Sequence, residues 1–249
     1  MEWAPGYREW APPAALRGSV MCLWASVLPA RRPDVTLVLP DACIDLIWQS
    51  GRGVYVAGPD TGPAPEPLAG GTVLAGVRLR PGAGGPALGV PLSELLDQRV
   101  EAADVGSGLT TSLFRRADGG LAPDEAMRLM VEAVSPAVAD GPADPLVTAA
   151  VRLLAGPGAQ AGDAADDLGV SERQLRRRCQ AAVGYGPATL RRVLRFRRFL
   201  ALLDAGERDL ARAAAGAGYA DQPHLTRECA RLAGLSPAAL LAQRHPAVA

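Results

Sequence analysis

An internal repeat in the C-terminal half of the chain restricts the fold more than any other feature of the sequence. With an offset of 50 residues, Leu175 matches Leu225 and Cys179 matches Cys229. Four more pairs share this offset: Arg177 and Arg227, Gly184 and Gly234, Pro187 and Pro237, Leu190 and Leu240. A solenoid needs about three or more stacked units. Two copies therefore predict a duplicated helical unit.

The first copy, residues 161–183, has the pattern of a helix-turn-helix. Gly169 suits the left-handed end of a first helix. Ser171, with Gln174 three residues later, predicts a capping box at the start of a second helix. The predicted buried face of that helix contains Leu175, Cys179 and Ala182, and the predicted outward residues are Arg173, Arg176 and Arg177.

The second copy, residues 208–233, repeats this pattern. Gly218 ends its first helix and Asp221 is the predicted cap of its second. Its buried face contains Leu225, Cys229 and Leu232, and Gln222, His224 and Arg227 are left to project. Residues 187–205 between the copies predict one linker helix of about 18 residues, roughly 27 Å long.

The outward side chains of both copies suit contact with DNA. Arginine donates two parallel hydrogen bonds to guanine O6 and N7 in the major groove, and glutamine pairs similarly with adenine. We expect Arg173, Arg176 and Arg177 to contact bases or phosphates, although a purely solvated face is the alternative. His224 serves either as a local structural hydrogen-bonder or as a base reader. Three linker-helix arginines are expected to divide between phosphate contact and solvation: Arg195, Arg197 and Arg198.

The net charge of zero conceals two oppositely charged halves. Residues 1–145 contain 11 arginines and 17 carboxylates, whereas residues 146–249 contain 15 arginines and 9 carboxylates, and the chain has no lysine. The halves therefore carry net charges of −6 and +6. A basic module joined to an acidic one favours nucleic acid as the partner of the basic half.

The first ninety residues predict short strands. Residues 35–40, 43–48, 54–58 and 72–80 are apolar or alternating runs. Four prolines predict that residues 59–71 form a long loop and not a strand. Helices are expected at 91–98, from 109 to near Gly119, and at 123–138, where an apolar stripe of Met127, Met130, Val131 and Val134 is either core or a dimer seam.

The predicted fold class is therefore α+β, with a β-rich sandwich or small barrel in the domain at residues 1–138 and an all-α domain at residues 146–249. The Pro- and Gly-rich segment 139–145 is the predicted linker. The β-rich domain is expected to sense a small molecule or to mediate dimerisation.

An effector pocket in the first domain is predicted from Trp24, Trp48, Arg78 and Arg80, which combine apolar walls with groups that bind anions. Tyr55 is a further candidate, and a core role for these aromatic side chains is equally open. Two carboxylates near the same strand could suggest catalysis. We instead expect Asp41 to cap a turn and Asp45 to pair with Arg78 or Arg80.

The motifs of residues 145–245 resemble those of the AraC/XylS family of bacterial transcription regulators. They are Ala165, Leu168-Gly169-Val170-Ser171, Leu175, Arg177, Gly184-Tyr185-Gly186-Pro187, Gly218-Tyr219-Ala220-Asp221-Gln222-Pro223-His224 and Gly234-Leu235-Ser236-Pro237. Cys179, Cys229 and Leu225 stand where the family commonly has Phe, and Pro223 replaces a small or polar residue. The N-terminal segments 39–48, 75–83 and 91–105 resemble an uncharacterised β-rich sensor domain of actinobacterial-type regulators, and this resemblance implies a cupin-like barrel followed by helices.

The resemblance implies a sequence-specific transcription regulator that responds to an effector. Its partners would be double-stranded DNA, a small-molecule effector, RNA polymerase and a second copy of the chain. A protein-interaction regulator that keeps the fold without binding DNA is the alternative. An enzyme is not expected: a DNA-repair methyl acceptor needs a reactive cysteine, and Cys22 and Cys43 lie in apolar strands.

The same sequence predicts no cofactor, no metal site and no membrane partner. The chain has only two histidines, four cysteines without CxxC spacing, and no long apolar run. The residues at its beginning lack the apolar segment of a signal peptide. A cytoplasmic, nucleoid-associated protein is expected.

Overall fold

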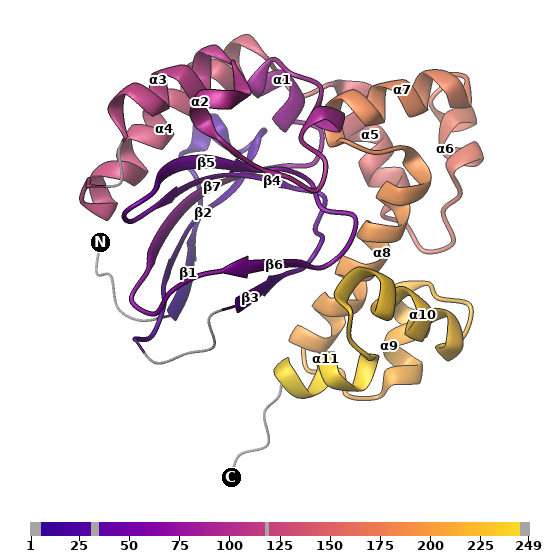
Figure 1. The fold of residues 1–249 in the computed structure, drawn as a ribbon. Coiled ribbons are helices and arrows are strands. Elements are labelled where there is room, and N and C mark those ends of the chain that lie inside the picture. Colours follow the sequence, from indigo (N-terminus) through magenta and orange to yellow (C-terminus); the bar gives the residue numbers. More distant parts are fainter. Residues whose placement is uncertain (1–5, 31–34, 118–119, 245–249) are drawn as a thin grey trace.

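The computed structural model describes residues 6–30, 35–117 and 120–244. Eight strands lie in the N-terminal half and the C-terminal half is helical (Figure 1). The main antiparallel sheet has the order β1 (Gly6–Trp10), β2 (Val20–Val27), β7 (Val73–Leu79), β4 (Ile44–Gln49), β5 (Gly53–Ala57) and β8 (Arg99–Glu101). A second sheet pairs β3 (Val35–Val38) with β6 (Ala64–Pro67).

The two faces of the main sheet have different partners. Leu46 and Trp48 of β4 and Val77 of β7 belong to a core that includes helix residues such as Met130. Ile47 of β4, one position away, belongs to a separate cluster on the opposite face. This period of two is the alternation expected of a strand that is covered on both sides.

Helices cover one face of the main sheet, and the β3–β6 pair lies across the other (Figure 1). The helices are α1 (Gly84–Leu88), α2 (Ala102–Val105), α3 (Gly108–Arg116) and α4 (Pro123–Asp140). Met127, Met130 and Val134 of α4 are buried in this core, so the apolar stripe packs inside the protein. The architecture confirms the predicted β-rich N-terminal part, with the two sheets arranged as an incomplete barrel.

The prediction that residues 59–71 contain no strand is wrong, because Ala64–Pro67 forms β6. The register pairs Leu37 with Pro65 and Val35 with Pro67. Two prolines separated by one residue can both direct their nitrogens away from the neighbouring strand, so neither removes a hydrogen bond between β3 and β6. Glu66 between them is half-buried and both prolines are exposed.

The prediction of a helix over residues 91–98 is also wrong. Only Leu92–Glu94 forms a short 3₁₀ turn, and β8 follows. Asp97 has a left-handed backbone with a φ of 56°, and its carboxylate accepts hydrogen bonds from the backbone and hydroxyl groups of Thr61. These hydrogen bonds between residues far apart in the sequence favour an irregular conformation over a helix at residues 95–98. The helix predicted from residue 109 is α3, which ends at Arg116, and the expected end near Gly119 lies outside the described residues.

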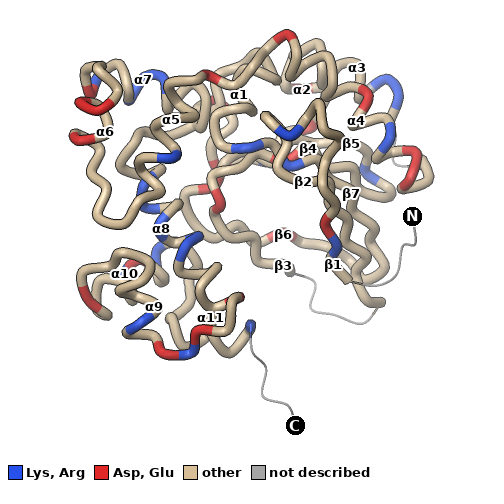
Figure 2. Tube along the Cα trace, turned by 180° about the vertical axis from the view of Figure 1, so that it is seen from behind, with Lys and Arg blue, Asp and Glu red and all other residues tan. Residues whose placement is uncertain are grey.

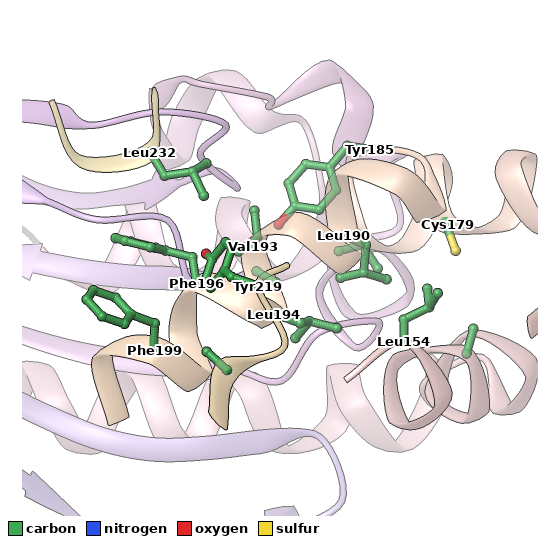
Figure 3. Packing of buried hydrophobic residues seen from close by; sticks show 14 of the residues in the cluster. Leu154, Cys179, Tyr185, Leu190, Val193, Leu194, Phe196, Phe199, Tyr219 and Leu232 are labelled. Atoms are coloured by element: carbon green, nitrogen blue, oxygen red, sulfur yellow. The ribbon is translucent and has the colours of Figure 1, made fainter. Parts of the chain in front are cut away.

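The C-terminal helices follow the repeat. They are α5 (Pro145–Leu154), α6 (Ala161–Asp167), α7 (Glu172–Val183), α8 (Pro187–Asp204), α9 (Leu210–Ala217), α10 (Gln222–Ala233) and α11 (Pro237–Arg244). Phe196, Phe199 and Tyr219 group around α8, with ring centroids 6.5 Å apart between Phe199 and each of the other two (Figure 3). The described residues include no helix long and apolar enough to cross a membrane.

The two halves pack closely against each other. Ala42, from the loop between β3 and β4, is 3% exposed and belongs to the C-terminal hydrophobic core. A Cβ atom on Gly85 of α1 would lie 2.5 Å from the carbonyl oxygen of Ala181 in α7. A side chain at position 85 would therefore push the helices apart.

Candidate DNA-binding surface and effector cavity

The recognition helix of the first copy, α7, begins and ends as its sequence predicts. The Ser171 hydroxyl accepts a hydrogen bond from the Gln174 backbone at 3.2 Å, and the Gln174 side chain accepts one from the Ser171 backbone at 3.0 Å. Gly184 ends the helix with a left-handed φ of 92°. Leu175 and Cys179 are fully buried. Their burial fixes which face of α7 remains outside.

The outer face of α7 is strongly basic. Arg173, Arg176 and Arg177 are exposed, and none of them forms an ion pair with a residue in the part of the chain that the structure describes. Arg178 differs, because its Nε lies 3.1 Å from the Asp144 carboxylate. Three of the four arginines are therefore available to an external anion, while the fourth holds α7 to the start of α5.

The second recognition helix, α10, is capped by Asp221. Its carboxylate accepts a hydrogen bond from the His224 backbone at 2.6 Å. Gln222 and Arg227 are exposed. The His224 ring is half-buried and meets the Tyr219 ring edge-on, with centroids 5.2 Å apart. This packing favours the structural interpretation of His224 over base reading.

The arginines of the linker helix α8 contact the protein, although three of them were expected to contact phosphates or to be solvated. Arg195 lies over the Tyr219 ring at 5.4 Å from its centroid. Arg197 donates to the Asp41 carbonyl oxygen at 3.0 Å. Arg198 donates to the Ala155 carbonyl oxygen. These three guanidinium groups are therefore not simply solvated, because carbonyl oxygens and a ring face supply partners that a search for acidic residues overlooks. Figure 2 shows basic positions on both α7 and α8.

A cavity of about 190 Å³ lies between the two sheets of the N-terminal half. Trp24, Tyr55 and Ile47 supply its apolar walls, and Arg78 supplies a charged group. Gly76 makes this arrangement possible, because a Cβ atom there would lie 2.1 Å from the Trp24 indole. The indole therefore lies against the backbone of β7.

Two of the four residues predicted to line an effector pocket do so. Trp24 and Arg78 line this cavity. Trp48 is 1% exposed and packs in the core under the helices, because its position in β4 points to the other face of the sheet. Arg80 follows the end of β7 and lines a different groove, near the C-terminal helices. Trp48 and Arg80 therefore do not line this cavity, which corrects their predicted positions.

Buried ion pairs fix the polar groups of the cavity. The Trp24 indole donates to Asp45 at 2.7 Å, and the Arg78 Nε lies 3.1 Å from the same carboxylate. Asp41 caps the following turn by accepting from the Cys43 backbone at 2.9 Å. Both carboxylates thus behave as expected for turn capping and internal pairing. Burial outweighs the attraction of Arg78 and raises the pKa of Asp45 above its ordinary value.

A second ion-pair cluster in the cavity was missed from the sequence. Arg99 of β8 meets the carboxylate of Asp60 at 2.9 Å and also that of Glu66 in β6. Burial raises the pKa of Asp60, although Arg99 opposes the shift. Glu66 fell in a segment predicted to be a loop. The one signal in the sequence was the alternation of Ala64 and Glu66 with two prolines, and the structure leaves the prolines exposed and the other two residues half-buried.

The thiol groups do not have the properties of a reactive cysteine. Burial raises the pKa of Cys22 to about 11, that of Cys179 to about 11 and that of Cys229 to about 12. Burial also raises the pKa of Cys43 well above its ordinary value. Nucleophilic cysteines need a lowered pKa. Among the described residues, no group of three His, Cys, Asp or Glu side chains is placed to hold a metal ion.

The fold and the two capped, outward-facing recognition helices define a regulator with a β-rich N-terminal part and a double helix-turn-helix C-terminal part. Residues 164–243 match the family model described as a helix-turn-helix domain. Residues 8–101 match a domain of unknown function, DUF6597. The chain is a DNA-binding transcription regulator with a helix-turn-helix domain. The helix-turn-helix match points to a regulator rather than to an enzyme.

Solved structures that are similar to this chain include the following two. A transcriptional regulator with an AraC-type DNA-binding domain from Chromobacterium violaceum is 26% identical, and the match covers 41% of this chain and 95% of that one with a TM-score of 0.38. ToxT from Vibrio cholerae O395 is 11% identical, and the match covers 90% of this chain and 98% of that one with a TM-score of 0.51. The ToxT match supports the fold of the whole chain. No curated protein matches the sequence.

Proposed function

We propose that residues 146–249 recognise specific DNA through α7 and α10, and that residues 1–138 regulate this binding. The observation that carries the proposal is the exposed face of α7, where Arg173, Arg176 and Arg177 have no carboxylate partner among the described residues. Three guanidinium groups on a helix that begins at a well-formed cap suit insertion into the major groove.

The two recognition helices would occupy successive major-groove segments. These segments recur about every 34 Å along one side of the DNA. The linker helix α8 contains 18 residues, which corresponds to about 27 Å. Gln222 and Arg227 are the exposed residues of α10 suited to base or phosphate contact. His224 would position α10, because its ring is occupied by Tyr219.

The cavity between the sheets would hold a small effector. Its volume of about 190 Å³ is close to that of a cavity of about 150 Å³ that accepts benzene. An effector with one ring therefore fits better than a long chain. Trp24 offers a flat apolar wall, while Asp41, Asp60 and Glu66 offer acceptors. These acceptors favour a ligand that donates hydrogen bonds.

A short path connects this cavity to the DNA-binding half. Asp41 lines the cavity, its carbonyl oxygen accepts from Arg197 of α8, and its neighbour Ala42 packs in the C-terminal core. A ligand that moves the loop around Asp41 would change contacts of the helix that joins the two recognition helices. This path supports regulation by an effector.

Further partners follow from the proposed role. A second copy of the chain would occupy a repeated half-site on DNA, and RNA polymerase would be the target of an activator. DNA binding also supports a cytoplasmic, nucleoid-associated location. The segment 139–145 would connect the regulatory and DNA-binding parts, since α4 ends at Asp140 and α5 begins at Pro145.

The direct test is fluorescence anisotropy of the full chain on DNA fragments from the region flanking its own gene, compared with random DNA. We expect a preferred fragment and an affinity that falls steeply with salt, because each neutralised phosphate contributes about −0.9 to the slope of log K against log salt. Absence of both sequence preference and salt dependence would favour the alternative, a protein-interaction regulator that keeps the fold without binding DNA.

A further inference from the structure

A groove of about 460 Å³ runs between the N-terminal sheet and the helices of the C-terminal half. It lies apart from the effector cavity, which is lined by different residues. Four arginines line it: Arg17 before β2, Arg80 after β7, Arg152 of α5 and Arg197 of α8. Each half of the protein therefore supplies two of the four.

No carboxylate balances these arginines. The groove lining contains neither Asp nor Glu. Within the described ranges, none of the four forms an ion pair. Other arginines of the protein do find carboxylates, such as Arg78, Arg99 and Arg192. A concave surface lined by one sign of charge raises the local concentration of counter-ions.

Two of the guanidinium groups are already oriented. The Arg80 Nε donates to the Arg17 carbonyl oxygen at 2.9 Å, and an Arg197 terminal nitrogen donates to the Asp41 carbonyl oxygen at 3.0 Å. Each guanidinium has five N–H donors, so each keeps several for a ligand. Holding an arginine in place before binding lowers the entropy lost when it contacts an anion.

We propose that this groove binds a small molecule with at least two phosphate or carboxylate groups. Arginine forks match the oxygen pairs of both groups. The groove volume is within the range of about 300–1,000 Å³ typical of ligand sites. One anionic group could engage Arg17 and Arg80 while another engages Arg152 and Arg197. The ligand would then bridge the two halves.

The test uses the full-length protein and inorganic pyrophosphate, measured by isothermal titration calorimetry at constant ionic strength. We expect saturable binding of about one pyrophosphate per chain and much weaker binding of inorganic phosphate. Arg152→Ala should weaken pyrophosphate binding at least about tenfold, because one charge-assisted contact is worth about that much. Arg152 is exposed, so this variant should retain the fold by circular dichroism.

Two further variants sharpen the result. Arg80→Ala should weaken binding comparably, which would place the ligand between the halves. Arg128→Ala is the matched control, since Arg128 is an exposed arginine on α4 outside the groove. Equal loss in the control, or no saturable binding by the wild type, would overturn the proposal. So would a result in which Arg152→Ala leaves pyrophosphate binding unchanged but weakens binding to random DNA, because the groove would then be a contact for the DNA backbone.

Discussion

The two helix-turn-helix copies share a core but differ on their surfaces. Leu175 and Leu225 are both fully buried, as are Cys179 and Cys229. Outside, Arg173 and Arg176 of the first copy correspond to Pro223 and Thr226 of the second. Duplication has therefore preserved packing while the outward chemistry has diverged. The recognition helix of the first copy, α7, has more exposed arginines than α10 of the second.

The copies also differ in their contact with the N-terminal half. Gly184, at the end of α7, lies so close to Pro59 that a Cβ atom would be 2.5 Å from its Cγ. The equivalent Gly234, at the end of α10, leaves 3.6 Å to Pro63. The N-terminal half therefore holds the first copy more tightly than the second. Regulation by that half would act most directly on the copy with the more basic recognition helix.

The largest effect should come from the unmatched arginines. Replacing Arg173 and Arg176 together with alanine should lower affinity for the preferred DNA site at least about thirtyfold, since each lost contact costs about 1–3 kcal/mol. Arg177→Ala and Arg227→Ala alter equivalent positions. Each should lower the affinity by a similar factor, and that factor should be smaller than for the double variant. Anisotropy titrations measure all three, with Arg128→Ala as control. If the double variant binds DNA no more weakly than Arg227→Ala, the proposed difference between the two recognition helices is contradicted.

The next effect separates the two contacts with the N-terminal half. Gly234→Ala should lower the free energy of unfolding by about 1–2 kcal/mol, because alanine is strained at its φ of 65°. Gly184→Ala carries the same kind of strain at a φ of 92° and adds the clash with Pro59. Its cost should therefore be larger. Urea unfolding monitored by circular dichroism compares the two variants. Equal losses in the free energy of unfolding would show that Pro59 moves aside without loss of stability.

A smaller effect should distinguish the helix caps. Ser171→Ala removes the acceptor for the Gln174 backbone, and Asp221→Ala removes the acceptor for the His224 backbone. Each should cost about 0.5–2 kcal/mol. Asp221→Ala should be the costlier, because its carboxylate also interacts favourably with the helix dipole. Asp221→Asn, which keeps the acceptor but loses the charge, should have an intermediate stability in thermal unfolding; a cost equal to that of Asp221→Ala would assign the effect to charge alone.

The smallest effect concerns Tyr185, at the boundary between the halves. Its buried hydroxyl has no hydrogen-bond partner among the described residues, so Tyr185→Phe should change stability little at pH 7. Burial raises the pKa of Tyr185 well above the ordinary value near 10, with Asp41 adding to the shift. A raised folded pKa gives stability that is complete below pH 10 and is lost as the pH rises above it.

The phenylalanine variant should therefore lose less stability than the wild type above pH 10. Thermal unfolding between pH 8 and 11 measures the difference. Tyr219→Phe is the comparison within the second copy, since burial also raises the pKa of Tyr219. An identical alkaline decline in wild type and Tyr185→Phe would contradict the assignment.

Local sequence signals predicted those structural features that depend on residues close together in the sequence. The Ser171–Gln174 box, the Asp221 cap and the helix end at Gly218 each depend on contacts within a few residues. The buried leucines follow from helical spacing. Similarly, the pairing of Asp45 with Arg78 could be anticipated because both residues lie in neighbouring apolar strands.

What the sequence left unpredicted depends on distant contacts. Asp60, Glu66 and Arg99 meet only because β6 and β8 come together beside the cavity. Trp48 and Trp24 are similar in type, and only the strand register places them on opposite faces of the sheet. Arg198 satisfies a backbone carbonyl 43 positions earlier in the chain. Such acceptors exist in every residue, so sequence patterns do not identify them.

The bond from Arg197 to position 41 has one more consequence. Its acceptor is a backbone carbonyl oxygen and not the Asp41 side chain. Every amino acid carries that oxygen, so no substitution at position 41 deletes the acceptor itself. The Asp41 side chain could therefore diverge to suit another effector while the link to α8 persists. In this way ligand preference and signal transmission can evolve independently at a single residue.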